Sequence, residues 1–142
     1  MDTSSSIPII EVLRVVDGNT VAAKIELDFG NPRAVIVRLG GIRTPRLRDL
    51  AQAKAAMAAK TAAEKWIADQ HGELRLIVHE WDRQGRAWGD IVKCSEGLIP
   101  ESLGAWLRAE GYARSCDGGT KNKWTDEELT RIESRGAEEA RP

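Results

Sequence analysis

Hydrophobic and polar positions alternate along the first third of the chain in the way that is typical of β-strands. β-branched residues dominate positions 9–16, and in positions 21–27 the hydrophobic side chains fall on one face and the charged side chains on the other. Positions 34–39 alternate in the same way. Two turn sequences, Asp-Gly-Asn at 17–19 and Phe-Gly-Asn-Pro at 29–32, separate these runs. The pattern therefore predicts three antiparallel strands joined by tight turns.

An alanine-rich segment with helical periodicity follows these strands. Pro45 ends the third strand, and Asp49 is placed to cap a helix that runs to about Gln70, with Gly72 as its C-terminal cap. The apolar positions that we expect this helix to bury are Leu50, Ala59, Ala63, Trp66 and Ile67. A stripe of this kind predicts a helix that packs on the strands.

The second half of the chain predicts two strands and two helices. Positions 74–80 alternate, and positions 87–93 form another strand after a turn at 82–85. Apolar residues then recur with helical spacing from Pro100, a favourable first helical residue, to Gly111. These features predict a hairpin followed by a short helix.

A last helix follows a polar linker. Thr125 and Glu128 are spaced as a capping box, and Trp124 and Leu129 as a hydrophobic staple. Apolar residues become few after Ile132. We therefore expect this helix to dock by its first turns and to fray at its end.

The order of these elements predicts an α+β fold that is mainly β. Three antiparallel strands, a helix and two further strands form a five-stranded barrel of the OB type, here with two C-terminal helices. We expect a flexible N-terminus over residues 1–8, the barrel domain over residues 9–116, a linker over residues 117–124 and the C-terminal helix over residues 125–142.

Composition narrows the classes of function. The 142 residues fit one domain, and the 42% hydrophobic and 30% charged content is ordinary for a globular protein. The net charge of −1 means that any attraction to nucleic acid must be local. No apolar run approaches the roughly 18 residues of a membrane span, and the polar start lacks a signal-peptide pattern. Cys94 and Cys116 are too few and too far apart for a disulfide framework or a thiolate zinc site. We expect a cytoplasmic protein with no membrane partner.

Three short motifs carry the candidate chemistry. They read D-G-N-T at residues 17–20, R-L-G-G-I-R-T-P-R at residues 38–46 and D-R-Q-G-R at residues 82–86. In this order they resemble the D-G-D-T, R-L-x-x-I-D-T-P-E and D-x-Y-G-R motifs of the staphylococcal nuclease family. The resemblance covers about residues 9–115 and implies the OB-fold barrel of that family, with a cleft for phosphodiesters.

The resemblance also implies roles for individual residues. In the family, two aspartates hold a calcium ion, a glutamate positions or deprotonates the attacking water, and two arginines grip the phosphate. Arg38 and Arg86 match the two arginines, whose planar guanidinium groups can each take two phosphate oxygens. Asp17, Thr20 and Thr44 also match family positions.

The acidic residues of the family are replaced in this chain. Asn19 and Arg43 stand where the family has aspartates, and Arg46 stands where it has the glutamate. A guanidinium and a divalent ion about 4 Å apart repel by roughly 8 kcal/mol at an effective dielectric constant near 20. Arg46 cannot act as a base, because a guanidinium stays protonated and accepts no hydrogen bond. We therefore expect no catalytic residue and no cofactor. Asp17, Asn19 and Thr44 are the residual candidates for a metal site.

Arginines take the place of the lost acids. Positions 29–48 contain five arginines and no acid. The candidates for phosphate contact are Arg38 and Arg86, followed by Arg43 and Arg46, and the candidates for base stacking are Trp81 and Trp88. The chain is thus expected to be an inactive nuclease-like module that binds single-stranded nucleic acid or a protein partner in an assembly. The alternative is an active, calcium-dependent phosphodiesterase in which Asp17, Glu80 or Asp82 rebuilds the metal site.

Overall fold

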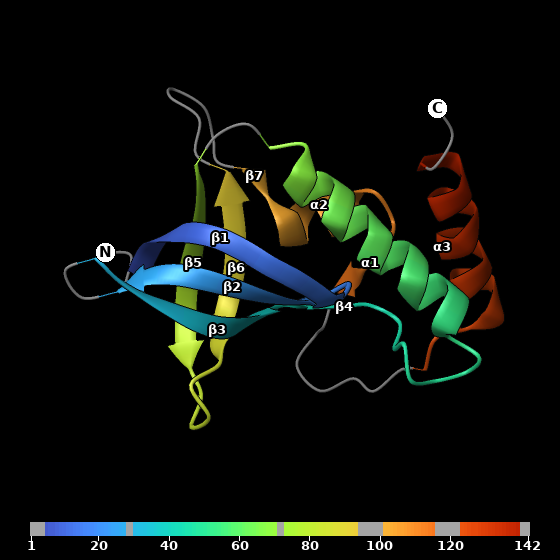
Figure 1. The fold of residues 1–142 in the computed structure, drawn as a ribbon. Coiled ribbons are helices and arrows are strands. Elements are labelled where there is room, and N and C mark those ends of the chain that lie inside the picture. Colours follow the sequence, from blue (N-terminus) through green and yellow to red (C-terminus); the bar gives the residue numbers. More distant parts are fainter. Residues whose placement is uncertain (1–4, 28–29, 71–72, 94–100, 116–122, 140–142) are drawn as a thin grey trace.

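The computed structural model describes residues 5–27, 30–70, 73–93, 101–115 and 123–139. Within these ranges, five long strands close into a mixed β-barrel, and three helices gather at one end of it (Figure 1). The barrel strands are β1 (Ser5–Asp17), β2 (Thr20–Leu27), β3 (Asn31–Leu39), β5 (Leu74–Trp81) and β6 (Ala87–Lys93). They follow the order β3-β2-β1-β5-β6, and a parallel pairing between β3 and β6 closes the ring. The predicted α+β, OB-like fold is confirmed.

Alternation along the strands fills the barrel as the sequence predicted. In β2 the residues Val21, Ala23 and Ile25 are fully buried, and in β3 the same holds for Val37. Leu76 of β5 is also fully buried. Each of these side chains points inward because neighbouring strand residues point to opposite faces of the sheet.

Strand β1 departs from simple alternation. Its pairing with β2 shifts by one residue after Ile9, again after Val12 and again after Val15. The residues that these bulges leave without a partner are Ile10, Leu13 and Val16. Inward side chains therefore recur at every third position, while Ile10 and Leu13 are exposed. Bulges bend a strand and increase its twist, which suits a long strand that wraps around a barrel.

The prediction of a flexible N-terminus over residues 1–8 is wrong for residues 5–8. These residues form the start of β1 and pair with β5, from Ser5 opposite Val78 to Pro8 opposite Arg75. The guanidinium of Arg75 donates to the carbonyl oxygen of Ser6 at 3.0 Å and to its hydroxyl at 2.6 Å. Backbone pairing orders this polar stretch, and residues 1–4 lie outside the described residues.

Helix α1 (Ala53–Ala68) begins later than predicted. Asp49 accepts a hydrogen bond from the backbone of Ala51 and so caps a preceding turn, while Gln52 occupies the helix N-cap without a side-chain hydrogen bond that caps the helix. Leu50, predicted to be buried, lies in this turn and is 96% exposed. The other predicted inward residues are confirmed: Ala59, Ala63 and Trp66 are buried, and Ile67 is partly buried. Gly72, the predicted cap, lies outside the described residues.

Helix α2 (Leu103–Ala109) lies between the last barrel strand and the last helix, and three short strands complete the described structure. Pro100, the predicted start of α2, lies outside the described residues, and Ser102 caps the helix by accepting from the backbone of Ala105. Strand β7 (Glu101–Ser102) pairs with β6, and β4 (Ile42–Arg43) pairs with β8 (Arg114–Ser115) in a separate two-stranded sheet. The predicted linker over residues 117–124 lies almost wholly outside the described residues.

Helix α3 (Asp126–Glu139) starts with the predicted capping box. Thr125 donates its backbone N–H to the carboxylate of Glu128, and Glu128 returns its N–H to the Thr125 hydroxyl. Contrary to prediction, α3 docks along most of its length on α1 (Figure 1). Gly136 lies so close to Ala58 that an added Cβ would meet the Ala58 methyl at 2.7 Å. Small residues late in the helix therefore extend the contact that apolar residues begin.

No helix among the described residues is both long and apolar enough to cross a membrane.

Candidate functional site

The turn between β1 and β2 uses its own polar groups. The Asp17 carboxylate accepts a hydrogen bond from the backbone N–H of Asn19 at 3.0 Å, which is the geometry by which aspartates commonly fix a turn. The Thr20 hydroxyl lies 3.3 Å from the side-chain oxygen of Asn19. Asp17 and Thr20 are also paired across the hairpin. The side chains of Asp17 and Asn19, the two candidate metal ligands of this turn, thus both accept hydrogen bonds from groups of the turn itself.

Gly18 brings this turn against the second motif. A Cβ at Gly18 would lie 2.9 Å from the side chains of both Thr44 and Ala59, so only glycine permits this approach. Thr44 is 6% exposed, and its hydroxyl oxygen has no hydrogen-bond partner among the described residues. Such a buried, unpaired hydroxyl costs about 1–3 kcal/mol. The motifs at 17–20 and 38–46 therefore meet at a small residue and a buried hydroxyl.

These groups are a poor set of ligands for calcium. The ion takes about six to eight oxygen ligands, several of them from carboxylates. The turn and Thr44 offer a single carboxylate, that of Asp17, together with the carboxamide of Asn19 and one hydroxyl. Over the ranges that the structure describes, no three side chains of His, Cys, Asp or Glu gather closely enough to hold a metal ion.

Closure of the barrel creates a row of side chains across its outer face. Thr20 of β2 pairs with Arg38 of β3, Arg38 pairs with Trp88 of β6, and Trp88 pairs with Glu80 of β5. Paired residues point to the same face of a sheet. Arg38 and Trp88 are 50 residues apart in sequence, and only the parallel β3–β6 pairing makes them neighbours.

The Arg38 guanidinium forms a cation–π contact with the ring of Trp88. The distance from its Cζ to the ring centroid is 4.9 Å. Such contacts contribute about 0.5–1 kcal/mol at exposed sites. The Nε of Arg38 is buried without a hydrogen-bond partner, and Arg38 forms no ion pair with any described residue. The Nη edge of this cation is therefore the part that can receive an anion.

Arg86 is fixed by the turn that precedes β6. One carboxylate oxygen of Asp82 accepts from the backbone N–H groups of Gln84 and Arg86, both at 2.9 Å. The other oxygen accepts from Nε of Arg86 at 2.6 Å. Partial burial raises the pKa of Asp82, but the hydrogen bonds from Arg86 and Gln84 outweigh it and lower the pKa overall. Asp82 is thus ionised at neutral pH and holds the Arg86 side chain in place.

The β3–β6 pairing brings Arg38 and Trp88 to one face of the barrel. Arg86 lies in the turn that leads into β6, two residues before Trp88. Trp81 does not join them, because it pairs with the buried Ala87 and so points to the opposite face of the hairpin. The two predicted stacking residues therefore do not form one platform. Trp88 instead supports Arg38.

The other two candidate arginines lie after the end of β3. Arg43 belongs to β4, between the buried Ile42 and Thr44, and is in register with Arg114 of β8. Arg46 is exposed, and its backbone N–H donates to the side chain of Gln52 at 2.9 Å. Both therefore belong to the segment that leads from the barrel to α1.

Sequence reasoning missed two residues of this site. Asp82 was considered as part of a turn and as a candidate to rebuild a metal site, but not as the partner of Arg86, although the spacing from Asp82 to Arg86 allows the carboxylate to reach the guanidinium. Gly89 was not singled out, yet it allows β5 and β6 to approach closely. An isolated glycine within a strand pattern is a recognisable signal of such an approach.

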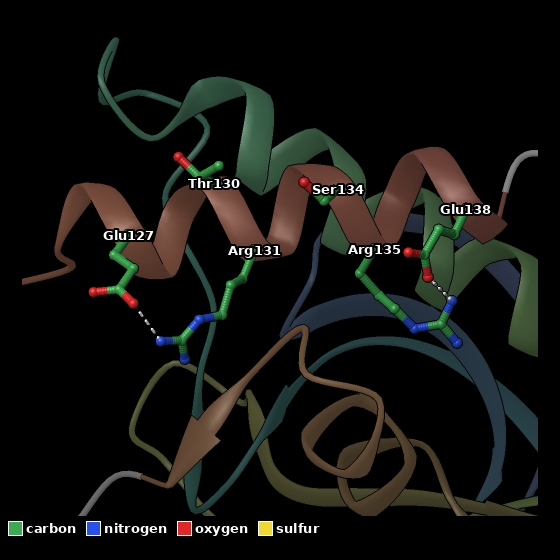
Figure 2. A pocket seen from close by; sticks show the side chains of 6 residues that line it. All are labelled: Glu127, Thr130, Arg131, Ser134, Arg135 and Glu138. Carbon is green, nitrogen blue, oxygen red and sulfur yellow. Dashed lines mark hydrogen bonds and ion pairs between the residues drawn. The ribbon is translucent and has the colours of Figure 1, made fainter.

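A surface depression along α3 carries charges that are already paired. It has a volume of about 480 Å³ and is lined by Glu127, Thr130, Arg131, Ser134, Arg135 and Glu138 (Figure 2). Arg131 pairs with Glu127 at 2.8 Å, and Arg135 lies 3.9 Å from Glu138. Pairs at this helical spacing are typical of a solvated helix face.

Comparison of the sequence with models of known protein families and with curated proteins finds no match. The functional interpretation therefore depends on the geometry of the site.

Proposed function

We propose that this chain is a catalytically inactive relative of the staphylococcal nucleases that holds the phosphate backbone of single-stranded nucleic acid. The observation that carries the proposal is the Arg38 guanidinium, which lies over the Trp88 ring and has no carboxylate partner among the described residues. The second candidate, Arg86, is held by Asp82 two residues before Trp88. A cation that is held in place without a counter-ion is suited to an anionic ligand.

Loss of hydrolysis is supported by the residues around Thr44. Phosphodiester hydrolysis needs a metal charge or its equivalent, an activated water and a cationic clamp. Asn19 has no charge, and Arg46 is an exposed guanidinium that accepts no proton at working pH. Of the three elements, only the clamp has clear candidates here.

Backbone binding predicts a strong dependence on salt. Each phosphate contact with a single strand contributes a slope of about −0.7 to the logarithm of affinity against the logarithm of salt concentration. Phosphate contacts carry little sequence information, so the affinity should vary little with base composition. Two arginines predict a slope near −1.4, or steeper if further cations take part.

The test is fluorescence anisotropy with a labelled oligothymidylate of roughly 16 nucleotides, the upper site size of an OB barrel. Arg38→Gln and Arg86→Gln should each weaken binding about tenfold, the effect of one charge-assisted contact. Arg131→Gln is the matched control, because it removes the same charge from the exposed face of α3. It should leave the affinity within about twofold of wild type.

Two outcomes would contradict the proposal. Failure of the wild type to bind at micromolar concentration in low salt would reject nucleic acid as the ligand and favour the assembly role. Cleavage of the oligonucleotide that needs calcium and stops with a chelator would favour the active phosphodiesterase.

A further inference from the structure

We propose that Asp82 is a positioning residue that presents the Nη edge of Arg86 to phosphate, rather than an acid that neutralises Arg86. This inference rests on the proposed function, because phosphate is the ligand to be received. It assigns Asp82, an acid beside an anion-binding surface, a role that favours anion binding.

The hydrogen bonds of Asp82 separate into two sets. One oxygen holds the turn through the backbone of Gln84 and Arg86, and the second oxygen holds only the Nε of Arg86. A guanidinium donates from five N–H groups in a rigid plane. With Nε taken by Asp82, the orientation of the plane is fixed. One Nη group also donates to the side-chain oxygen of Gln84 at 3.4 Å, and the other Nη N–H groups remain for a ligand.

Arg38 is presented in the same manner by different means. Its Nε is buried, and its Cζ lies 4.9 Å from the centroid of the Trp88 ring. The Nε of Arg38 is thus closed to a ligand by burial and the Nε of Arg86 by Asp82, which leaves the Nη groups of each to bind one. A phosphate bound by either arginine would be held end-on by two parallel N–H groups, the bidentate geometry in which charge-assisted contacts are strong.

The opposite role for Asp82 makes an opposite prediction. If Asp82 only screens Arg86, its neutralisation adds positive potential and tightens binding. If Asp82 positions Arg86, its neutralisation frees the side chain and weakens binding despite the added charge. Asp82→Asn distinguishes the two, because the asparagine oxygen can still accept from the turn backbone while its amide nitrogen cannot accept from Nε.

Glu80→Gln is the matched control for charge. Glu80 belongs to the same hairpin, lies opposite Trp88, is exposed and forms no ion pair among the described residues. Its neutralisation adds the same unit of positive charge beside the site. The expected effect is an affinity increase of about twofold, from Coulomb attraction over about 10 Å in water.

The experiment measures oligothymidylate affinity and its salt slope for wild type, Asp82→Asn, Glu80→Gln, Arg86→Lys and the double variant Asp82→Asn/Arg86→Lys. We expect Asp82→Asn to weaken binding about tenfold and to reduce the slope by about 0.7, as loss of one phosphate contact does. Arg86→Lys keeps the charge but lacks the planar fork, so we expect the same loss. The double variant should be no weaker than either single variant, because both remove one interaction.

Each result decides a different point. Binding by Asp82→Asn that is as tight as that of Glu80→Gln would overturn the positioning role and leave the proposed function intact. Additive losses in the double variant would overturn it as well, since Asp82 would then act independently of Arg86. Absence of binding by wild type would overturn the proposed function, and this inference with it. Urea midpoints measured by tryptophan fluorescence exclude unfolding of Asp82→Asn as the cause of a loss.

Discussion

Replacement of Gly89 by alanine is expected to disrupt the barrel at the point where it closes. Gly89 pairs with Val78 of β5 and with Leu39 of β3, and its carbonyl oxygen accepts from the backbone of Gly40 at 3.0 Å. A Cβ built on Gly89 would lie 1.7 Å from the carbonyl oxygen of Ile77, which is backbone and cannot rotate away. Strand β5 would have to move away from β6.

The size of the effect follows from that distance. An ordinary contact begins at 3.4 Å, so the strands would have to separate by about 1.7 Å at this point. A shift of that size breaks about two ladder hydrogen bonds, each worth about 1 kcal/mol, in addition to an overpacking cost of about 1–3 kcal/mol. We expect Gly89→Ala to lower the free energy of unfolding by about 3–5 kcal/mol, a large part of the roughly 5–15 kcal/mol of a typical domain.

Urea titration followed by tryptophan fluorescence measures this loss, and Gly40 supplies the control. Gly40 is hydrogen-bonded to Gly89, yet a Cβ on Gly40 would meet nothing within 4 Å, and its backbone is not in the left-handed region. Gly40→Ala should therefore stay within about 1 kcal/mol of wild type. A Gly89→Ala variant as stable as Gly40→Ala would refute the close approach of β5 and β6.

Three further predictions concern the site and the helices. Trp88→Leu removes the ring beneath Arg38 and should weaken oligothymidylate binding about threefold to fivefold in the anisotropy assay. Trp81→Leu, on the opposite face of the hairpin, should change the affinity by less than about twofold. The pKa of Glu128 lies below 4.5, mainly because its carboxylate accepts a hydrogen bond from the backbone of Thr125, and the side chain of Arg114 lowers it further. The ionised carboxylate therefore stabilises the fold above pH 4.5, and this contribution is lost as the pH falls through the folded pKa. Urea midpoints should show Glu128→Gln about 1–2 kcal/mol less stable at pH 7 and equal to wild type in strong acid. Burial raises the pKa of Asp90 above 3.8 against the hydrogen bond from Gly104, so the contribution of Asp90 to the stability should decline as the pH rises from 3.8 through the folded pKa. In urea midpoints measured against pH, the stability of Asp90→Asn relative to wild type should therefore rise over this range.

Local pattern was enough to predict most of the elements. In β2, β3 and β5 the residues Val21, Ala23, Ile25, Val35, Val37, Leu39, Leu76 and Val78 are buried where the alternation predicts. The capping box of α3 depends only on Thr125 and Glu128, three residues apart, and the structure contains both of its hydrogen bonds. These features are set by interactions that are close in sequence, and a pattern can reveal them.

Features that depend on distant segments were not predicted. The bulges of β1 place inward residues three apart, and this spacing arises because the strand must wrap around the barrel. The first strand begins at Ser5 because β5 is available to pair with it. Leu50 precedes α1 because Asp49 caps a turn and not the helix. In the first two cases a tertiary contact overrides the local preference, whereas at Leu50 a second local interaction, the turn capped by Asp49, competes with the helix.

The candidate site shows the same division. The motifs identified Arg38 and Arg86 by type and order, but not what holds them. Their supports are Trp88, which reaches Arg38 only through the β3–β6 register, and Asp82, which reaches Arg86 across a turn. A pattern can reveal the group that carries the charge, whereas the group that orients it depends on the fold.

Stability and the candidate site share one structural feature, the β3–β6 pairing. The inward residues of this short parallel ladder, Val37 with Ala87 and Leu39 with Gly89, close the core, and its outward pair is Arg38 with Trp88. A change that loosens the ladder therefore separates Arg38 from its support at the same time as it opens the barrel. Because the ladder spans only three residue pairs, no neighbouring pair can compensate. Variants that weaken closure without unfolding the chain should thus lose anion binding before they lose secondary structure.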